Sequence, residues 1–353
     1  MNRTGRHGVN VSLLLFLLAG LMPATGPAAP APPQASGQTH RFQADHYFNT
    51  FSFAHEPVLR IAPGDRVITK TIDARGFDET ETEVAGRWNP QTGPFYVEGA
   101  EPGDMLVVRI EKIEPNRTTA WSAQVLAPYA ADPFYLRSQG GRVPEPQPCV
   151  DLDSPRCEVW EIDLDEGIAR TTTPDLRPSV LEIPLVPMLG CVAVAPPNKE
   201  AVSTATPGEF GGNMDYFGLV EGVTLMLPVF EPGALLFVGD GHARQGHGEV
   251  AGNAMEISMD VEFSVDLVKG KTISWPRLEN EDYIIVLGSA RPLLQALQHA
   301  TTELQSWLMA DYGFDERAAG LLLGHLIEYE VANVVDPHFT VAAKLRKEYL
   351  PDD

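Results

Sequence analysis

The residues best suited to chemistry lie in one glycine-rich segment, residues 239–249, which reads Gly-Asp-Gly-His-Ala-Arg-Gln-Gly-His-Gly-Glu. Asp240 and His242 are two positions apart, so both side chains point to the same face if the chain is extended there. A carboxylate beside an imidazole can orient and activate a water molecule, or it can ligate a divalent metal. Because a segment rich in glycine and histidine is also typical of a solvated turn, this pattern alone indicates a candidate site without naming a reaction.

A second candidate segment lies upstream, at residues 211–215, and reads Gly-Gly-Asn-Met-Asp. The two glycines allow the backbone to approach a small ligand closely. Asn213 and Asp215 add an amide and a carboxylate two positions apart. We therefore expect this segment to offer polar groups to a ligand.

Short strands must position these residues. Between about His40 and Trp275 the sequence shows short apolar runs separated by Pro and Gly turns, which is typical of β structure. The apolar run at 235–238 directly precedes Asp240, and residues 255–267 alternate polar and apolar types, as a strand with one buried face does. After Gly288 the period changes to about 3.6, which predicts helices over residues 293–309 and 314–331. The fold class predicted is mainly β (α+β), with a β-rich part at 40–287 and a helical part at 289–349.

The amino-terminal residues indicate export. Arg3 and Arg6 precede an apolar run at 11–22, and small residues follow. This order predicts a signal peptide over residues 1–30, a disordered leader over 31–39 and a folded domain over 40–353. The apolar run is shorter than the roughly twenty residues that span a bilayer, so we expect a periplasmic or secreted protein without stable membrane insertion.

Charge and cysteines narrow the possibilities further. The net charge of −22 would repel phosphate backbones, so nucleic acid is not expected as a partner. Cys149 and Cys157 could close a local disulfide loop in an oxidising compartment. Cys191 lies in an apolar run and is expected to be a buried, inert thiol rather than a nucleophile.

Several longer motifs resemble those of the acetamidase/formamidase family. They are Phe-Gly-Gly-Asn-Met-Asp at 210–215, the glycine-rich segment 239–249 with Leu-Pro-Val at 227–229 before it, and Asn-Pro-Gln-Thr-Gly-Pro at 89–94 followed by the Val-Glu-Gly-Ala motif that contains Glu98. The resemblance implies a β-sandwich-like body with carboxy-terminal helices, hydrolysis of a small carboxamide to ammonia and a carboxylate, and assembly as a homo-oligomer. Carried over by position, it implies site residues Asp240, His242, Gln245, Glu249, Asn213, Asp215 and Glu98.

The roles of these residues follow from what amide hydrolysis needs, namely a nucleophile, oxyanion stabilisation and a proton for the leaving nitrogen. No Gly-x-Ser-x-Gly motif is present, so an activated water is expected, with Glu249 or Glu98 as base. Asp240 and His242, with Asp73, would hold a divalent metal, for which zinc is favoured and calcium is the alternative. Asn213, Asp215 and Gln245 would bind the substrate.

Two other interpretations stay open at this stage. A non-catalytic periplasmic β-sandwich could use the same pocket to bind a ligand or a structural calcium, since the carboxylate-rich stretch 73–83 would suit a hard cation. Within the enzyme class, the bond cleaved could belong to a cyclic amide instead of a linear one.

Overall fold

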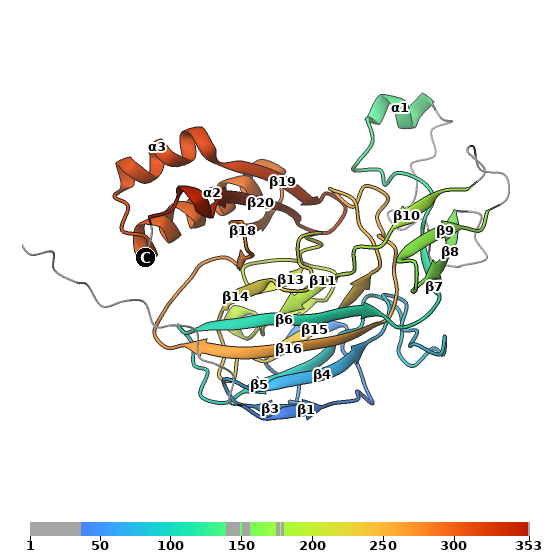
Figure 1. Cartoon of the computed structure of the whole chain (residues 1–353), viewed down its shortest axis with the longest axis horizontal. Coiled ribbons are helices and arrows are strands. Elements are labelled where there is room, and N and C mark those ends of the chain that lie inside the picture. The colour runs from blue at the N-terminus through green and yellow to red at the C-terminus, as the bar shows by residue number, and fades with distance from the viewer. Residues whose placement is uncertain (1–36, 139–148, 150–155, 174–176, 178–179, 352–353) are drawn as a thin grey trace, which may run out of the picture. The chain divides into compact units, whose positions relative to one another are not determined.

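The computed structural model describes residues 37–138, 149, 156–173, 177 and 180–351 (Figure 1). The predicted signal peptide and most of the predicted leader lie outside these residues. The last residues of the leader range are not all irregular, because the first strand begins at Thr39.

The largest layer is a nine-stranded sheet. Its strands lie in the order β1 (Thr39–Arg41), β4 (Arg66–Thr71), β16 (Met259–Val268), β6 (Met105–Pro115), β14 (Thr224–Pro228), β17 (Arg277–Glu279), β18 (Tyr283–Ala290), β20 (Phe339–Arg346) and β19 (Glu328–Asn333). All neighbours are antiparallel except β1 and β4. The alternation of residue types in β16 appears as alternating burial along its first half, as the sequence predicts.

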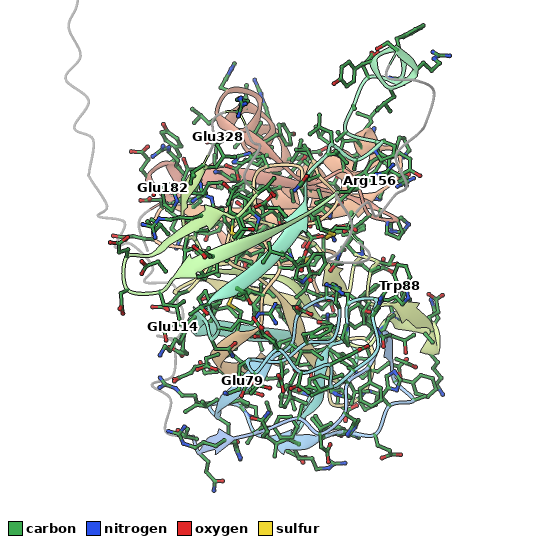
Figure 2. All side chains as sticks on the ribbon, turned by 90° about the vertical axis from the view of Figure 1, so that its right-hand side faces the viewer. Glu79, Trp88, Glu114, Arg156, Glu182 and Glu328 are labelled. Carbon is green, nitrogen blue, oxygen red and sulfur yellow. A yellow bond between two sulfur atoms is a disulfide. The ribbon has the colours of Figure 1, made fainter. Side chains whose placement is uncertain are left out.

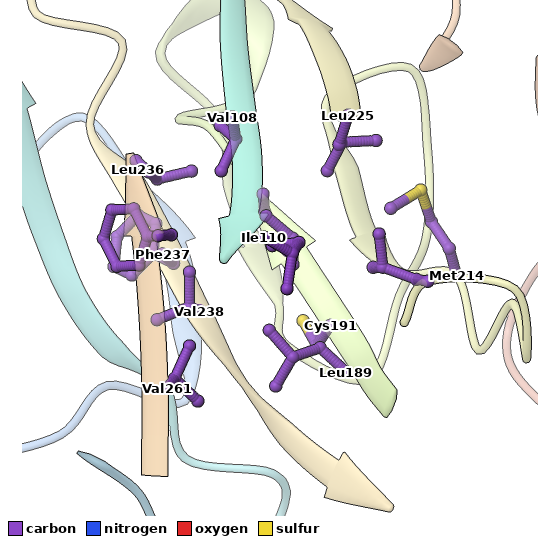
Figure 3. Packing of buried hydrophobic residues seen from close by; sticks show 14 of the residues in the cluster. Val108, Ile110, Leu189, Cys191, Met214, Leu225, Leu236, Phe237, Val238 and Val261 are labelled. Carbon is purple, nitrogen blue, oxygen red and sulfur yellow. The ribbon is translucent and has the colours of Figure 1, made fainter. Parts of the chain in front are cut away.

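A five-stranded sheet packs against the large one. Its order is β13 (Gly211–Asn213), β11 (Met188–Ala193), β15 (Leu236–His242), β5 (Thr92–Val97) and β3 (Leu59–Ile61). Figure 3 shows side chains of both sheets in one packed core, with Val108 and Ile110 from β6 and Leu189 and Phe237 from the smaller sheet. These shared contacts confirm a sandwich-like body, because each sheet buries one apolar face against the other.

Two smaller sheets complete the β structure of the described residues. One has the order β10 (Glu182–Pro184), β9 (Ile168–Thr171), β8 (Cys157–Asp163) and β7 (Thr119–Ala123), and it faces the viewer in Figure 2. The other pairs β12 (Ala201–Ser203) with β2 (Thr50–Ser52). A short helix, α1 (Pro133–Ser138), and two 3₁₀ turns, η1 (Pro197–Lys199) and η2 (Lys347–Tyr349), lie outside the sheets. Cys149 and Cys157 form a disulfide, the pairing that their spacing allows.

Two helices cover part of the nine-stranded sheet. The helix α2 (Leu293–Asp311) matches the predicted one, and α3 (Glu316–Leu326) begins after Asp315, whose carboxylate accepts a hydrogen bond from the Ala318 N–H. Leu304 and Trp307 of α2 belong to a second apolar cluster together with Val286 of β18. Figure 1 shows α2 beside β18 and β20. No helix among the described residues is long and apolar enough to cross a membrane.

The predicted helical range 289–349 is wrong in its second half. The chain leaves helical geometry at Ile327, where ψ is 135°, and continues as β19 and β20. Pairing of β20 with β18 along its whole length accounts for this outcome, because tertiary packing overrides weak local preference. The overall assignment to the mainly β (α+β) class is confirmed.

Candidate active site

Strand β15 brings Asp240 and His242 together at its end. His242 Nε2 lies 3.5 Å from Asp240 Oδ1, and both side chains are almost completely buried. The expectation that the two side chains share one face is therefore correct. Gly239, between the buried run and Asp240, has no room for a side chain, since a Cβ there would lie 2.4 Å from Gln91 Oε1.

Gln245 fixes the orientation of the imidazole. Its amide nitrogen donates hydrogen bonds to the backbone carbonyls of Asp215 and Ala332, so its Oε1 is the atom that faces His242 Nδ1, at 3.0 Å. His242 must then donate from Nδ1, and Nε2 is the nitrogen left to face the carboxylates. Gln245, predicted to bind substrate, instead positions His242.

Glu256 completes this group, although the sequence did not single it out. Its Oε1 lies 3.4 Å from His242 Nε2, and an isolated bridge pairs the two residues across the backbone. Within the described residues, His242 Nε2 and Glu256 Oε2 are buried without a hydrogen-bond partner. Glu256 was read as one position of an alternating strand, and only its register beside β15 marks it as a site residue.

Asp215 and Glu249 approach the same imidazole. Asp215, His242 and Glu249 offer ligand atoms within 4.8 Å of one another, as do Asp240, His242 and Glu256. Gly190 of β11 lies against the side chains of Asp215, Asp240 and His242. A Cβ built there would lie 2.4 Å from Asp215 Oδ1, 2.5 Å from Asp240 Oδ2 and 2.8 Å from His242 Cε1, so only glycine leaves room for these groups to converge.

Asparagine side chains hold the carboxylates in place. Asn213 Nδ2 donates to Asp215 Oδ2 at 3.0 Å and to Asp336 Oδ2 at 2.9 Å, while its Oδ1 accepts from Asn89 Nδ2 at 2.6 Å. These bonds use both amide hydrogens of Asn213 and one of the two lone pairs on its Oδ1. Asn213 therefore orients two acidic side chains, and it also lines the cavity beside them, so its predicted contact with substrate stays a prediction.

Three of the acidic residues have left-handed backbones. The φ angles are 44° for Asp215, 59° for Asp240 and 48° for Glu249. This conformation costs a non-glycine residue about 1 kcal/mol or more, and such strain concentrates at functional sites. The surrounding sheets therefore hold these carboxylates in positions that local preference would not choose.

Burial and neighbouring charges disturb the ionisation of the cluster. Burial is the main cause that raises the pKa of Glu256 to about 7 and of Asp336 to about 6. Burial also raises the pKa of Glu249 well above its ordinary value, and the nearby Asp336 charge adds to the rise. For His242, burial would lower the pKa, but the charges of Glu256 and Asp240 raise it well above its usual value. The cluster therefore favours bound protons or a bound cation.

The donor set around His242 fits a divalent metal. For ligands placed tetrahedrally about 2.0–2.1 Å from zinc, neighbouring donor atoms are about 3.4 Å apart. The distances from His242 Nε2 to Asp240 Oδ1 and Glu256 Oε1, 3.5 and 3.4 Å, match this edge length. The unpartnered Nε2 and the hydrogen bond at Nδ1 are also what a metal-binding histidine requires.

A small cavity of about 70 Å³ opens beside the cluster. The acidic and amide side chains that line it are Asn89, Asn213, Asp240, Glu249, Asn253, Glu256 and Asp336. The rest of its wall comes from Ala74, Arg75, Arg87, Trp88, Trp121, Cys149, Ala205 and Gly252. The metal-like donor set thus borders a space that a small ligand can enter.

Glu98 is not part of this cluster. Strand β5 runs antiparallel to β15, so its first residue, Thr92, pairs with Val238, and Gln91 just before it lies beside Gly239. Glu98 follows the other end of β5, beyond the pairing of Phe95 with Leu236. Its side chain is 51% exposed and forms an ion pair with Arg60. The proposed base at Glu98 is therefore withdrawn, because the direction of β5 carries this residue away from Asp240.

Asp73 is buried, but its carboxylate is hydrogen-bonded to residues outside the cluster around His242. Its Oδ2 accepts hydrogen bonds from Arg117 Nη2 at 2.6 Å and Trp121 Nε1 at 3.1 Å, and its Oδ1 accepts two backbone N–H bonds. Both oxygens are thus satisfied by protein donors, and Asp73 does not belong to either group that could hold a metal. Glu256 takes the place that the sequence interpretation gave to Asp73.

Cys191 lies beneath the site without taking part in it. The residue pairs with Gly239 across β11 and β15, and it is fully buried. Burial raises the pKa of its thiol well above the ordinary value, which keeps the thiol protonated. This agrees with the expectation of an inert core thiol.

Comparison with known proteins gives consistent matches. The acetamidase/formamidase family model matches residues 36–130 and 182–348. The fold is similar to that of the acetamidase from Yersinia enterocolitica, with a TM-score of 0.73 and 32% identity over 89% of this chain and 93% of that one. It is also similar to the acetamidase from Bacillus halodurans, with a TM-score of 0.70 and 28% identity over 88% of this chain and 98% of that one.

Among curated proteins, the acetamidase of Mycolicibacterium smegmatis is 29% identical over an alignment of 223 residues, and the match covers 51% of this chain and 53% of that protein. The chain thus spans about half the length of the curated relatives that it matches. The interval 131–181, which includes β8, β9 and both cysteines of the disulfide, lies outside the family match.

Proposed function

Because this chain belongs to the acetamidase/formamidase family, we propose that it hydrolyses a small carboxamide to ammonia and a carboxylate. One observation carries this proposal beyond family membership. His242 Nε2 is buried between Asp240 and Glu256 without a hydrogen-bond partner among the described residues, and these two carboxylates line the cavity. The non-catalytic binding alternative is not favoured, because the relatives are acetamidases.

The size of the cavity supports a small substrate. Its volume of about 70 Å³ has room for a few water molecules, each of which needs roughly 10–15 Å³ on the same measure. Drug-sized ligands occupy pockets of about 300–1,000 Å³. A short amide is therefore the carboxamide that this space suits.

We propose that Asp240, His242 and Glu256 hold a divalent metal. When bound, the metal would polarise the amide carbonyl and lower the pKa of a water molecule. Zinc is favoured because its ligand sets commonly combine imidazole and carboxylate, while calcium is the alternative because most of the donors are oxygens.

The remaining residues supply proton transfer and orientation. Glu249 lines the cavity, and burial raises its pKa well above the ordinary value, so its carboxylate binds a proton more readily than an ordinary one. It takes a proton from the attacking water as the new C–O bond forms, and it returns a proton to the nitrogen as the C–N bond breaks. Asn89 also lines the cavity and has a second amide hydrogen, beyond the one given to Asn213, that can stabilise the oxyanion.

Ammonia release is the decisive assay. The purified protein is incubated with formamide, acetamide and propionamide, and its metal content is measured by elemental mass spectrometry. Asp240→Asn should abolish release. Asp104→Asn should retain it, because Asp104 is a similarly buried aspartate that pairs with Lys269 and does not line the cavity. Activity that survives in Asp240→Asn, or that is unaffected by exhaustive chelation, would refute the assigned roles of the carboxylate or the metal.

Export and self-association are separate parts of the proposal. Residues 1–30 have the order of a cleaved signal peptide, with basic residues first, an apolar run next and small residues last. The Cys149–Cys157 disulfide also supports export, because disulfides persist in oxidising compartments. Intact mass of the protein from a periplasmic fraction should lack about the first thirty residues. Light scattering should show a homo-oligomer, and a monomer at micromolar concentration would contradict that part.

A further inference from the structure

The cavity has a polar part and an apolar part. Carboxylates and amides line the former, while Ala74, Trp88, Trp121, Cys149 and Ala205 supply apolar surface. A carboxamide has the same division between its polar head and its acyl chain. The head is matched by the hydrogen-bonding side chains, so the acyl chain is left to contact the apolar part.

Trp121 is held rigidly in this wall. It is 4% exposed and lies on β7, where its backbone exchanges two hydrogen bonds with Glu256, at 3.2 and 2.8 Å. Its indole nitrogen donates to Asp73, and the Arg75 guanidinium lies 5.5 Å from the ring centroid. The ring is thereby fixed beside a residue of the proposed metal set.

The disulfide packs directly against this tryptophan. Cys149, Cys157, Trp121 and Ala123 form one buried apolar cluster, in which Cys157 of β8 is paired with Ala123 of β7. The disulfide joins Cys149, a cavity-lining residue, to this sheet. Both cysteines lie in the interval that the family model does not match, so this part of the wall is not part of the shared family pattern.

We infer that Trp121 and the Cys149–Cys157 disulfide form the acyl-binding wall of the site and restrict it to amides with a compact aliphatic acyl group. The inference rests on the proposed amide hydrolysis. A rigid indole and a covalently fixed sulfur cannot move aside for a longer chain, so acyl groups of several carbons are excluded. In a hydrophobic pocket, one methylene changes the specificity constant by about 10–200-fold, which makes the effect measurable.

The test compares kcat/KM for acetamide and hexanamide. In Trp121→Leu the ratio of hexanamide to acetamide should rise at least about tenfold, because the smaller side chain opens the wall. Trp160→Leu is the matched control, since Trp160 is a buried tryptophan of the neighbouring strand that does not line the cavity. It should lower the melting temperature and leave the ratio unchanged. Should Trp121→Leu not fold, Trp121→Phe serves in the same comparison.

The disulfide is tested by the double variant Cys149→Ser, Cys157→Ser. It should raise KM for acetamide and raise the ratio of hexanamide to acetamide, because the wall loses its covalent support. A merely structural role would lower activity toward both amides equally. Ammonia release with an unchanged ratio in every wall variant would overturn the acyl-binding wall alone, whereas no release from any amide by the wild type would overturn it together with the proposed function.

Discussion

Replacing Gly190 by alanine tests whether the convergence of acidic groups on His242 is what makes the site. Gly190 lies in β11 with a backbone that any residue can adopt, so the added methyl acts through its volume alone. It would enter the space where Asp215 Oδ1, Asp240 Oδ2 and His242 Cε1 meet, at 2.4 to 2.8 Å from each. The substitution therefore displaces three site residues and leaves their side chains chemically unchanged.

The size of the effect follows from these distances. Ordinary contact begins at 3.4 Å, so the three groups would have to retreat by about 0.6 to 1.0 Å. A misplacement of about 1 Å at a catalytic group can cost about 100-fold in rate, and overpacking a core costs about 1–3 kcal/mol of stability. We expect kcat/KM for a small amide to fall by about 100-fold, with metal affinity reduced as well.

Two other glycines provide controls for the loss of stability. Gly288→Ala would place a Cβ 2.3 Å from the Ala296 carbonyl oxygen of α2, so it crowds the contact between α2 and β18, a strand that supplies no lining residue of the cavity. Gly324→Ala, in α3, meets no atom within 4 Å and should be neutral or stabilising. Thermal unfolding, metal titration and kcat/KM are measured for all three variants.

The pattern across the three variants decides the matter. Gly288→Ala should lose stability and keep its kcat/KM, while Gly190→Ala should lose kcat/KM even at temperatures where it is fully folded. If Gly190→Ala retains activity and metal affinity within about twofold of wild type, the close packing around Gly190 has no functional role. The assignment of the converging groups would then have to be abandoned.

Further predictions concern residues that support the site or the fold. Gln245→Leu removes the acceptor that orients the imidazole, so metal affinity should fall about 10–100-fold in a chelator competition, and an unchanged affinity would contradict that role. Arg117→Met leaves Asp73 buried without its cation and should cost about 3–5 kcal/mol in urea unfolding. Arg170→Met, at an ion-pair cluster on the surface, should cost much less. Burial would raise the pKa of Asp65, but hydrogen bonds from two backbone N–H groups and a histidine lower it below 3.8. The ionised Asp65 therefore stabilises the fold above pH 3.8, and this stabilisation is lost as the pH falls through the lower pKa of the folded state. Asp65→Asn should be less stable than the wild type at about pH 6, and the two stabilities should converge below about pH 4.

Much of the fold was accessible from sequence because its signals are local. The alternation before Leu267, the Pro and Gly turns between short apolar runs, and the 3.6 period from Leu293 each predict a nearby element, and the structure contains those elements. The failure at 328–346 has a physical cause. Whether those residues continue a helix or pair with β18 depends on a partner strand that no local pattern reveals.

The sequence by itself determined the part of the site that lies on one segment. Asp240 and His242 lie two positions apart at the end of β15, and Glu249 follows on the next loop, so their nearness along the chain is visible in the sequence. Only the tertiary structure decided which distant carboxylates join them. Strand pairing places Glu256 beside His242, an asparagine bridge draws in Asp336, and the direction of β5 carries Glu98 away. Which acidic groups face one another is settled by register and strand direction, and these depend on the packing of the whole chain.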